Sequence, residues 1–319
     1  MPWAAIAFCA RAFHTYAVPP SRSDLADFTY FLAIARHRSF SRAGLELGVT
    51  ASGLSHALKG LESRLGVRLL NRTNRSVTLT AAGEALRDAV ERPFAEIGLA
   101  VESLNRFRDT PAGRIRLNVV ADAATLLLGP VMATFADRYP DVEVDIVASN
   151  RIVDVIDAGF DAGIRHGGTV PEDMIAQRLS ADLRWVVAAS PAYLERFGTP
   201  ASPSDLAQHR CIGVRLGDDR IYRWEFEGPD GEFAVQVTSR ITADDGRAML
   251  AMALGGSGLV YGVEPLFNPY VASGALSLVL ETWSTTGLGY ELYYPSRRHV
   301  PTGLRALIDL IRELRPLGL

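Results

Sequence analysis

The sequence predicts an all-α winged helix-turn-helix N-terminal domain, a long linker helix, and a two-lobed α/β C-terminal domain. Three observations support this fold class. Apolar residues recur at helical spacing over residues 24–65, a heptad-like pattern continues to about residue 108, and strand-like apolar runs alternate with helical stretches from residue 113 onward. A chain of 319 residues has room for two or three such domains.

The same patterns set the expected boundaries. We expect a disordered extension or misassigned start over 1–23, the winged helix-turn-helix over 24–80, a linker dimerisation helix over 81–110, and the α/β domain over 111–319, with lobe I at about 113–180 and 285–319 and lobe II at about 181–284. The apolar run Trp3–Ala10 follows no basic segment and is far shorter than the roughly 20 residues of a membrane span. We therefore expect no secretory signal and no membrane partner.

Three helices are predicted in the first domain. The first covers about 24–36, with one apolar face formed by Leu25, Phe28, Leu32 and Ala35. The second covers about 42–47 after an N-cap at Ser41, and Gly48 ends it. The third covers about 51–65 between a Thr50 cap and Gly66, with its core face formed by Leu54, Leu58, Leu61 and Leu65. Two helices joined by a glycine-containing turn predict a helix-turn-helix, and the basic-tipped segment 67–80 predicts a β-wing.

Charge is concentrated on this domain. The window from Arg36 to Arg75 holds eight basic and two acidic residues, a net charge of +6 that leaves −9 for the rest of the chain. A basic block on an acidic body indicates a module that binds a polyanion. The two cysteines, Cys9 and Cys211, are far apart and lack metal or disulfide spacing, which favours reduced thiols in a cytoplasmic protein.

The third helix is the candidate DNA-reading element. Small polar residues near its N-terminus would let the backbone approach base edges in the major groove, and the wing arginines could reach the flanking backbone or minor groove. The predicted DNA-binding residues are Arg42, Thr50, Ala51, Ser52, Ser55, His56, Lys59, Arg72 and Arg75. The alternative is a small helical bundle with a solvated basic face.

Residues 81–108 predict one long helix. Its apolar residues step by four and three along a seam formed by Val90, Phe94, Ile97, Val101 and Leu104. Because this helix stands between two domains, the seam favours a homodimer interface, while Pro93 should kink the helix. Beyond it, the alternation of strands and helices predicts βαβ units and a mostly parallel sheet, including a helix over 152–158.

Several motifs resemble the LysR-type transcriptional regulators. In the N-terminal domain they are the segments 31–35, 39–43, 45–50, 54–56, 61–62, 65–70, 71–73 and 79–83, and in the C-terminal half 135–142, 159–165, 189–194 and 294–298. The resemblance covers roughly 24–316. It implies a winged helix-turn-helix, a dimerising linker helix, an effector domain like type 2 periplasmic binding proteins, and a dimer of dimers on a promoter. Gly44 and Gly53 depart from it, since the family often has alanine there, and each could weaken its helix by about 1 kcal/mol.

In such a two-lobed domain a ligand binds at the strand ends between the lobes. The predicted effector-binding residues are Asp122, Asn150, Arg165, His166, Asp245 and Tyr261. Arg165 would suit an anionic effector, but Asp122 and Asp245 argue against a simple anion site. The alternative for Arg165 is a salt bridge that stabilises a lobe.

No nucleophile elbow, phosphate loop or zinc-protease motif is present in the sequence, and the six histidines lack ligand spacing. We expect no enzyme activity, metal or cofactor. The expected function is sequence-specific binding of double-stranded operator DNA by a cytoplasmic homodimer or homotetramer that responds to an unknown small-molecule effector. The alternative is a ligand-sensing, solute-binding-like protein without functional DNA binding.

Overall fold

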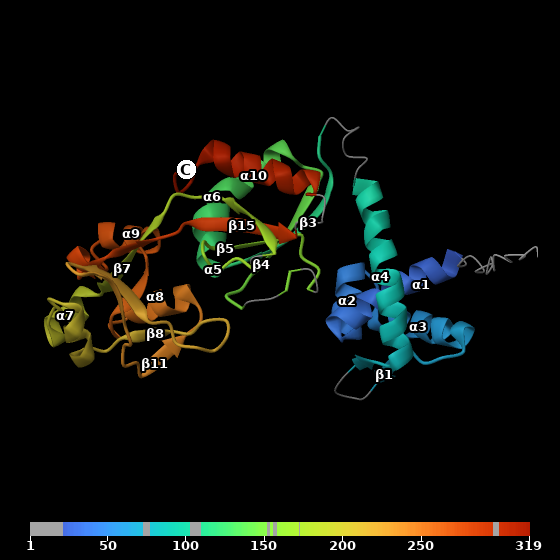
Figure 1. Ribbon diagram of the computed structural model, residues 1–319, viewed down its shortest axis with the longest axis horizontal. Coiled ribbons are helices and arrows are strands. Elements are labelled where there is room, and N and C mark those ends of the chain that lie inside the picture. The colour runs from blue at the N-terminus through green and yellow to red at the C-terminus, as the bar shows by residue number, and fades with distance from the viewer. Residues whose placement is uncertain are drawn as a thin grey trace, which may run out of the picture. The chain divides into compact units, whose positions relative to one another are not determined.

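The computed structural model describes residues 22–72, 77–102, 110–151, 154–155, 158–171, 173–295 and 300–319. The chain divides into two compact units, Met1–Ile97 and Gly98–Leu319, which Figure 1 colours from blue to red along the sequence. Most of the predicted N-terminal extension, all of the wing tip with Arg75, and Leu104 of the linker seam lie outside the described residues.

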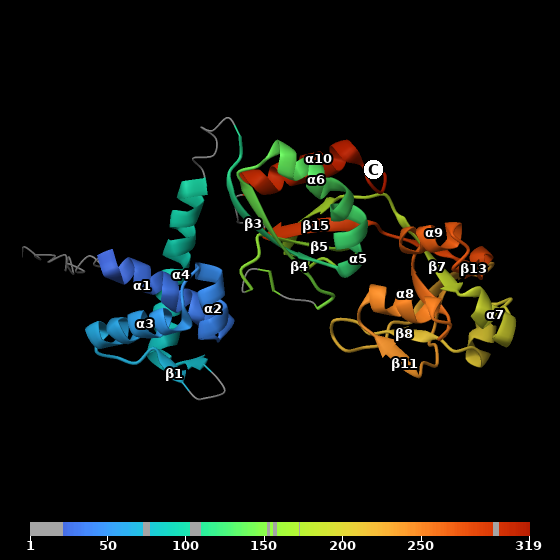
Figure 2. The same ribbon diagram turned by 180° about the vertical axis from the view of Figure 1, so that it is seen from behind.

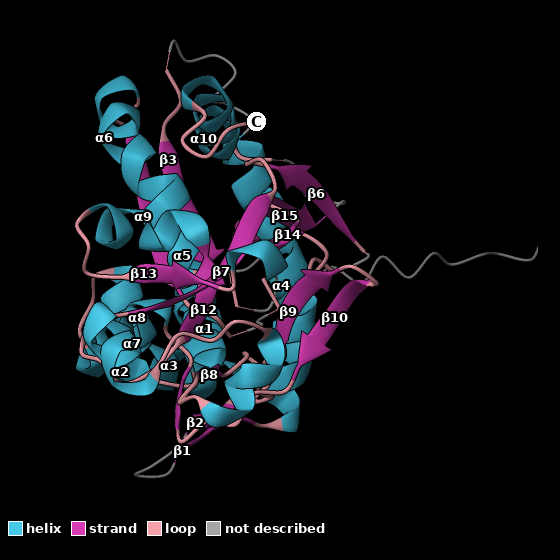
Figure 3. Ribbon diagram, turned by 90° about the vertical axis from the view of Figure 1, so that its left-hand side faces the viewer, coloured by secondary structure: helices cyan, strands magenta, loops and turns pink. Residues whose placement is uncertain are grey.

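The first unit is a helical domain with a small antiparallel hairpin. Strands β1 and β2 pair from Leu70 opposite Leu79 to Arg72 opposite Val77, and they form the base of the wing (Figure 3). Its elements are α1 (Arg22–His37), α2 (Phe40–Leu47), α3 (Ala51–Leu65), β1 (Leu70–Arg72), β2 (Val77–Leu79) and α4 (Ala81–Glu102). The α4 helix continues across the boundary between the two units.

Helix α2 begins earlier than predicted, because Ser39 and not Ser41 is its N-cap. The extended backbone of Ser39 lets its hydroxyl accept from the backbone N–H of Arg42 at 3.3 Å. The prediction was correct at the other ends: Gly48 ends α2 in the left-handed region with φ 66°, and Thr50 caps α3 by accepting from the N–H of Gly53 at 3.1 Å.

Gly44 is required by the turn between α2 and α3. The N–H of Val49 donates to the carbonyl of Gly44 at 2.9 Å, which brings the two backbones together. A Cβ at Gly44 would lie 2.5 Å from the carbonyl oxygen of Val49, closer than van der Waals contact allows. An alanine here would force the turn apart, so in this chain the glycine permits the close approach.

The core face of α1 differs from the predicted one. Phe31 and Ile34 are fully buried with Leu54, Leu58 and Leu61 of α3, whereas Leu25 and Leu65 are more than 40% exposed. Phe28, on the predicted face, instead packs edge-on against Phe94 of α4, with ring centroids 6.3 Å apart. Of the residues on the predicted face of α1, Phe28 thus has a partner on α4, while the buried core residues of α1 lie elsewhere on the helix.

Lobe I of the second unit is built on a five-stranded sheet with the order β4-β3-β5-β15-β6. Strands β3, β4 and β5 run parallel, and β15 returns antiparallel between β5 and β6. Helices α6 and α10 pack together over one face of this sheet, as Figures 1 and 2 show from opposite sides. The elements are β3 (Gly113–Val119), α5 (Ala121–Ala123), the π-helical turn η2 (Ala124–Leu128), α6 (Gly129–Arg138), β4 (Val142–Ala148), β5 (Ala162–His166), β6 (Met174–Arg178), β15 (Tyr290–Pro295) and α10 (Thr302–Leu314).

Lobe II is built around β7, which β12, β13 and β14 all join antiparallel. The prediction of a mostly parallel sheet is therefore wrong for this lobe. Residues of β7 alternate between two cores: Val186 and Ala188 face α8 and α9, while Val187 and Ala189 face α7 and the β9–β10 hairpin. Because both faces are covered, β7 is apolar from Trp185 to Ala189, and such a run does not reveal strand direction.

The remaining elements complete lobe II. They are β7 (Leu183–Ala189), α7 (Pro191–Phe197), the 3-10 helix η3 (Pro203–Gln208), β8 (Ile212–Val214), β9 (Trp224–Gly228), β10 (Gly231–Val235), β11 (Ile241–Ala243), α8 (Gly246–Leu254), β12 (Val260–Val263), α9 (Glu264–Ala272), β13 (Ser277–Val279), the 3-10 helix η4 (Glu281–Trp283) and β14 (Thr285–Gly287). The helix expected over 152–158 falls largely outside the described residues. Within the described ranges, no helix has the length and hydropathy needed to cross a membrane.

Candidate DNA-binding and effector sites

Helix α3 presents a polar stripe opposite its buried leucines. Ser52, His56 and Lys59 are exposed and follow each other at intervals of four and three residues, so they lie on one face. Ala51, at the start of the helix, is half-buried. The stripe begins at a capped helix N-terminus, where a DNA phosphate would meet favourable partial charge.

Several other predicted DNA-binding residues make contacts inside the domain. Thr50 caps α3, and the guanidinium of Arg72 donates to the Ser55 hydroxyl at 2.8 Å. Arg72 also lies over the ring of Phe40, 4.7 Å from its centroid, and 3.6 Å from a carboxylate oxygen of Glu62. Arg72 and Ser55 thus join the wing to α3, and their contact with DNA stays a prediction.

The basic residues of this domain fall into two groups. Arg36 pairs with Glu46, and Arg64 pairs with Asp24 and Asp27 at 2.9 and 2.5 Å. These carboxylates raise the pKa of Arg64, with the Asp27 hydrogen bond as the largest cause. The basic residues that form no ion pair with any residue the structure describes are Arg38, Arg42, Lys59 and Arg68.

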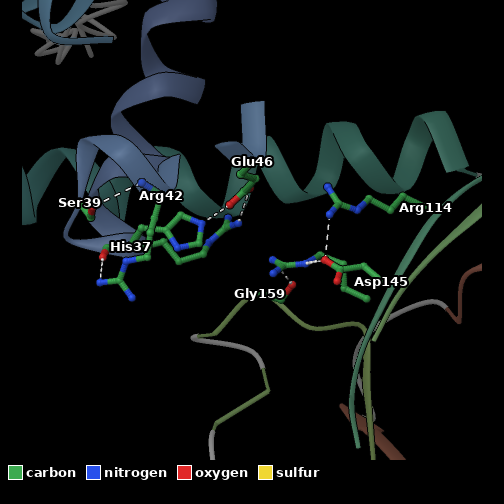
Figure 4. A network of polar contacts seen from close by, with 9 residues as sticks. His37, Ser39, Arg42, Glu46, Arg114, Asp145 and Gly159 are labelled. Carbon is green, nitrogen blue, oxygen red and sulfur yellow. Dashed lines mark hydrogen bonds and ion pairs between the residues drawn. The ribbon is translucent and has the colours of Figure 1, made fainter. Parts of the chain in front are cut away.

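Arg42 lies close to this ion-pair network. It donates to the carbonyl of His37 at 2.8 Å, and the His37 ring in turn contacts Glu46 (Figure 4).

Figure 4 also shows an ion pair on the second unit, where Arg114 of β3 donates to Asp145 of β4 at 2.8 Å. The sequence prediction omitted Arg38 and Arg68, although both belong to the basic window that pointed to this domain.

In the second unit, the structure brings Asp122 and His166 together at the strand ends of lobe I. The His166 Nε2 lies 3.0 Å from Asp122 Oδ2, and the backbone N–H of Ala123 donates to Oδ1 at 2.8 Å. Burial by itself would raise the pKa of Asp122. The hydrogen bond and charge of His166, with help from the Tyr290 hydroxyl and the Ala123 amide, outweigh burial and lower that pKa.

Arg165 is 7% exposed and contacts neutral groups. Its guanidinium donates to the carbonyls of Ser149 at 2.6 Å and Arg151 at 2.7 Å, and to the side chain of Asn118. Burial is the main reason that its pKa is lowered. Since no described carboxylate lies within ion-pair distance, the structure does not contain the salt bridge that was the alternative for this residue.

Asn150 lies between the two lobes, next to predicted residues of each: it contacts the residue before Asp122 and the residue before Asp245. Its Oδ1 accepts from the N–H of Ala121 in lobe I at 3.2 Å, while its Nδ2 donates to the carbonyl of Asp244 in lobe II. Asp245 is the N-cap of α8, where its carboxylate accepts from the N–H of Ala248 at 2.8 Å. Asn150 and Asp245 thus already have partners within the chain.

Tyr261 connects to this region through aromatic rings. It stacks on Trp185 with centroids 5.4 Å apart, and Trp185 lies 5.1 Å from the His166 ring. The Tyr261 hydroxyl donates to the carbonyl of Glu225, and burial raises its pKa above the ordinary value. Sequence reasoning missed Trp185 and Tyr290, because a tryptophan and a tyrosine in apolar strands look like core residues.

Other groups in the described part of the chain lie apart from these contacts. A cavity of about 270 Å³ lies between η3 and β10 and includes none of the predicted effector residues. Burial raises the pKa of Cys211 to about 12, which keeps its thiol protonated at neutral pH. No cluster of three histidine, cysteine or acidic side chains within the described ranges could hold a metal ion.

Two family models match the chain. Residues 25–84 match the bacterial regulatory helix-turn-helix protein of the lysR family, and residues 108–316 match the LysR substrate binding domain. The uncharacterized HTH-type transcriptional regulator YcaN of Escherichia coli is 38% identical over 291 residues, which cover 91% of this chain and 95% of YcaN. The regulator PgrR of the same organism is 33% identical over 91% of this chain and 98% of its own length.

Solved structures show the same architecture along nearly the whole chain. The LysR-type regulator CrgA of Neisseria meningitidis is 30% identical, covers 91% of this chain and 98% of its own, and has a TM-score of 0.58. A full-length AphB variant, 22% identical with a TM-score of 0.72 over 90% of this chain and 97% of its own, shows the shared fold. The chain therefore belongs to the LysR family and is a sequence-specific DNA-binding transcriptional regulator that responds to a small-molecule effector.

Proposed function

We propose that the chain binds its operator as a homodimer, with α3 of each protomer in a major groove and half-sites about one helical turn apart. The observation that carries this proposal is the exposed stripe of Ser52, His56 and Lys59 opposite the buried leucines of α3. In this arrangement Ser52 and His56 would read base edges, and Lys59 would bind a phosphate. Arg38, Arg42 and Arg68 add cationic side chains without carboxylate partners among the described residues.

We propose α4 as the dimer interface. Ile97 and Val101 lie four residues apart on one face of this helix and are 56% and 63% exposed. Two exposed apolar side chains in register along a long helix favour a second copy of the same helix as their partner. Further contacts between α/β domains would join two dimers into a homotetramer.

We propose that the effector binds between the two lobes, near Asp122, His166 and Trp185. The hydrogen bond between Asp122 and His166 lies within lobe I, and the ring contact between His166 and Trp185 joins lobe I to lobe II. Effector binding would change lobe closure, and through it the arrangement of the dimers and the bend in the DNA. We propose no catalytic activity, which agrees with a family of transcriptional regulators.

Salt-dependent DNA binding tests the proposal directly. Fluorescence anisotropy would follow full-length protein on labelled DNA from the gene's own upstream region, with unrelated DNA as competitor. We expect tight binding that resists the competitor and weakens steeply with salt. Equal affinity for both DNAs, together with no enriched site in a genome-wide binding selection, would favour the alternative of a ligand sensor without an operator.

A further inference from the structure

The side chain of Asn150 forms hydrogen bonds with both lobes. Asn150 follows β4 in lobe I, and its Oδ1 accepts from the N–H of Ala121 in the same lobe at 3.2 Å. Its Nδ2 donates across to the carbonyl of Asp244, which follows β11 in lobe II. One amide therefore uses its acceptor on one lobe and its donor on the other.

Arg165 forms hydrogen bonds with the backbone on both sides of Asn150. The guanidinium donates to the carbonyls of Ser149 at 2.6 Å and Arg151 at 2.7 Å, one on each side of Asn150. The N–H of Ser149 also donates to the carbonyl of Val119 at 2.8 Å. Burial of a guanidinium without an anion is costly, and the planar fork of arginine suits two carbonyls at once.

The acceptor in lobe II is also fixed in place. Asp245, the next residue, caps α8 through the N–H of Ala248, and the carbonyl of Ala243, the preceding residue, accepts from the N–H of Arg215 at 2.8 Å. The carbonyl of Asp244 therefore has a defined position relative to lobe II. The residues on each side of Asn150 and of Asp244 are thus held by hydrogen bonds within their own lobes. The Asn150–Asp244 bond therefore depends on the separation of the lobes.

We infer that Asn150 is a latch that holds the lobes closed without an effector, and that the buried Arg165 is the positioning residue that aims it. This inference deepens the proposed effector role of the region between the lobes and rests on it. An effector that enters this region must first compete with the Asn150 bond, and Arg165 acts on the lobes through Asn150 instead of contacting the effector.

The test measures the distance between the lobes in full-length protein without effector. Spin labels would be attached at Asp309→Cys on α10 and Glu195→Cys on α7, both exposed positions, in a Cys9→Ser background. Cys211 is 3% exposed and stays unlabelled. Dilution with unlabelled chain removes distances between protomers, and pulsed electron resonance gives the distance distribution.

Asn150→Asp is the sharpest variant, because it keeps the acceptor for Ala121 and removes the donor to Asp244. We expect a broader distribution at longer distance, with the open-to-closed ratio raised roughly threefold to tenfold, as for the loss of one hydrogen bond. Arg151→Gln is the matched control: its side chain lies beside the latch and forms no hydrogen bond or ion pair with a described residue. We expect it to keep the parent distribution.

Arg165→Lys tests the positioning role, since it keeps the charge and loses the fork. We expect it to broaden the distribution as Asn150→Asp does, and the double variant to add nothing further. A parent-like distribution in Asn150→Asp would overturn the latch, even if operator binding proved correct. An additive double variant would overturn the role of Arg165. Asn150→Asp decides the latch by itself if Arg165→Lys fails to fold.

Discussion

Glu62 shows how one residue ties the wing to the reading helix. Its Oε1 accepts from the backbone N–H groups of Leu69 at 2.8 Å and Leu70 at 3.2 Å, and its Oε2 lies 3.6 Å from Arg72. A carboxylate that accepts two amides at the start of β1 fixes where the hairpin begins. Residues of the basic window therefore divide into those that organise the domain and those that face solvent.

Lys59 and Arg64 separate these two roles, because they are five residues apart on the same helix. In Lys59→Gln, the plot of log affinity against log salt concentration should become less steep by about 0.9, the value for one lost phosphate contact. The thermal stability of this variant should stay unchanged. Arg64→Gln should leave the slope unchanged and lower the melting temperature, since it removes the partner of Asp27, which is 8% exposed. Salt titrations by anisotropy and thermal melts measure both. An unchanged slope for Lys59→Gln would mean that Lys59 does not contact a phosphate.

Asp122 should make stability sensitive to acid. Its pKa is below the ordinary value of 3.8 in the folded protein, so its contribution is present above about pH 4 and is lost as the pH falls through the folded pKa. Asp122→Asn should therefore lower the free energy of unfolding at neutral pH, and the difference from the parent should shrink below about pH 4. Urea unfolding across this pH range measures it. A difference that is independent of pH would show that the pKa of Asp122 is the same in the folded and unfolded states.

Among the elements, α4 has two kinds of apolar residue. Phe94 is used within its own unit against Phe28, whereas Ile97 and Val101 stay exposed. The heptad-like pattern alone does not separate them, because a seam residue has the same spacing whether its partner is a neighbouring helix or another chain. Pro93 lies inside α4, which continues to Glu102.

Val101→Asp should weaken the proposed dimer. The burial of one large apolar side chain contributes about 1.5–3 kcal/mol, so the dimer dissociation constant should rise about tenfold or more. Ala95→Asp places the same charge at another exposed position of α4 and is the control. Sedimentation equilibrium measures both variants. Equal dissociation constants for the two would exclude this face of α4 as the interface.

At the scale of the whole molecule, each unit has hydrophobic clusters of its own. The core of the first unit draws on α1, α2, α3, the wing and the start of α4, while the cores of lobes I and II draw only on residues beyond 113. Within the second unit, the chain passes between the two lobes twice, from β6 to β7 and from β14 to β15. Each unit therefore has its own basis for stability.

A fragment of residues 110–319 should accordingly fold alone and bind no operator. We expect its melting transition by calorimetry to coincide with one of two transitions in the full chain, because its cores are complete. Arg64→Gln in the full chain should shift only the other transition. A single cooperative transition in the full chain, or an unfolded fragment, would show that the units depend on each other for stability.

The sequence alone was enough to identify the family, the helix-turn-helix, and the caps at Gly48, Thr50 and Gly66. These features depend on local chemistry: helical spacing, side-chain capping and left-handed glycines act within a few residues. Of the residues predicted for the effector site, Asp122 and His166 lie in contact, because strand ends on one edge of a sheet come together. That they bind an effector stays a prediction.

Only the tertiary structure decided which partners those residues take. Arg165 has two backbone carbonyls in place of a carboxylate, Arg72 lies on Phe40 and Ser55, and the antiparallel pairing of β7 reverses the predicted direction of the lobe II sheet. Each of these depends on contacts between residues far apart in the chain. A local sequence pattern indicates that a polar side chain needs a hydrogen-bond partner. Which residue becomes that partner depends on the fold, because the fold brings distant parts of the chain together.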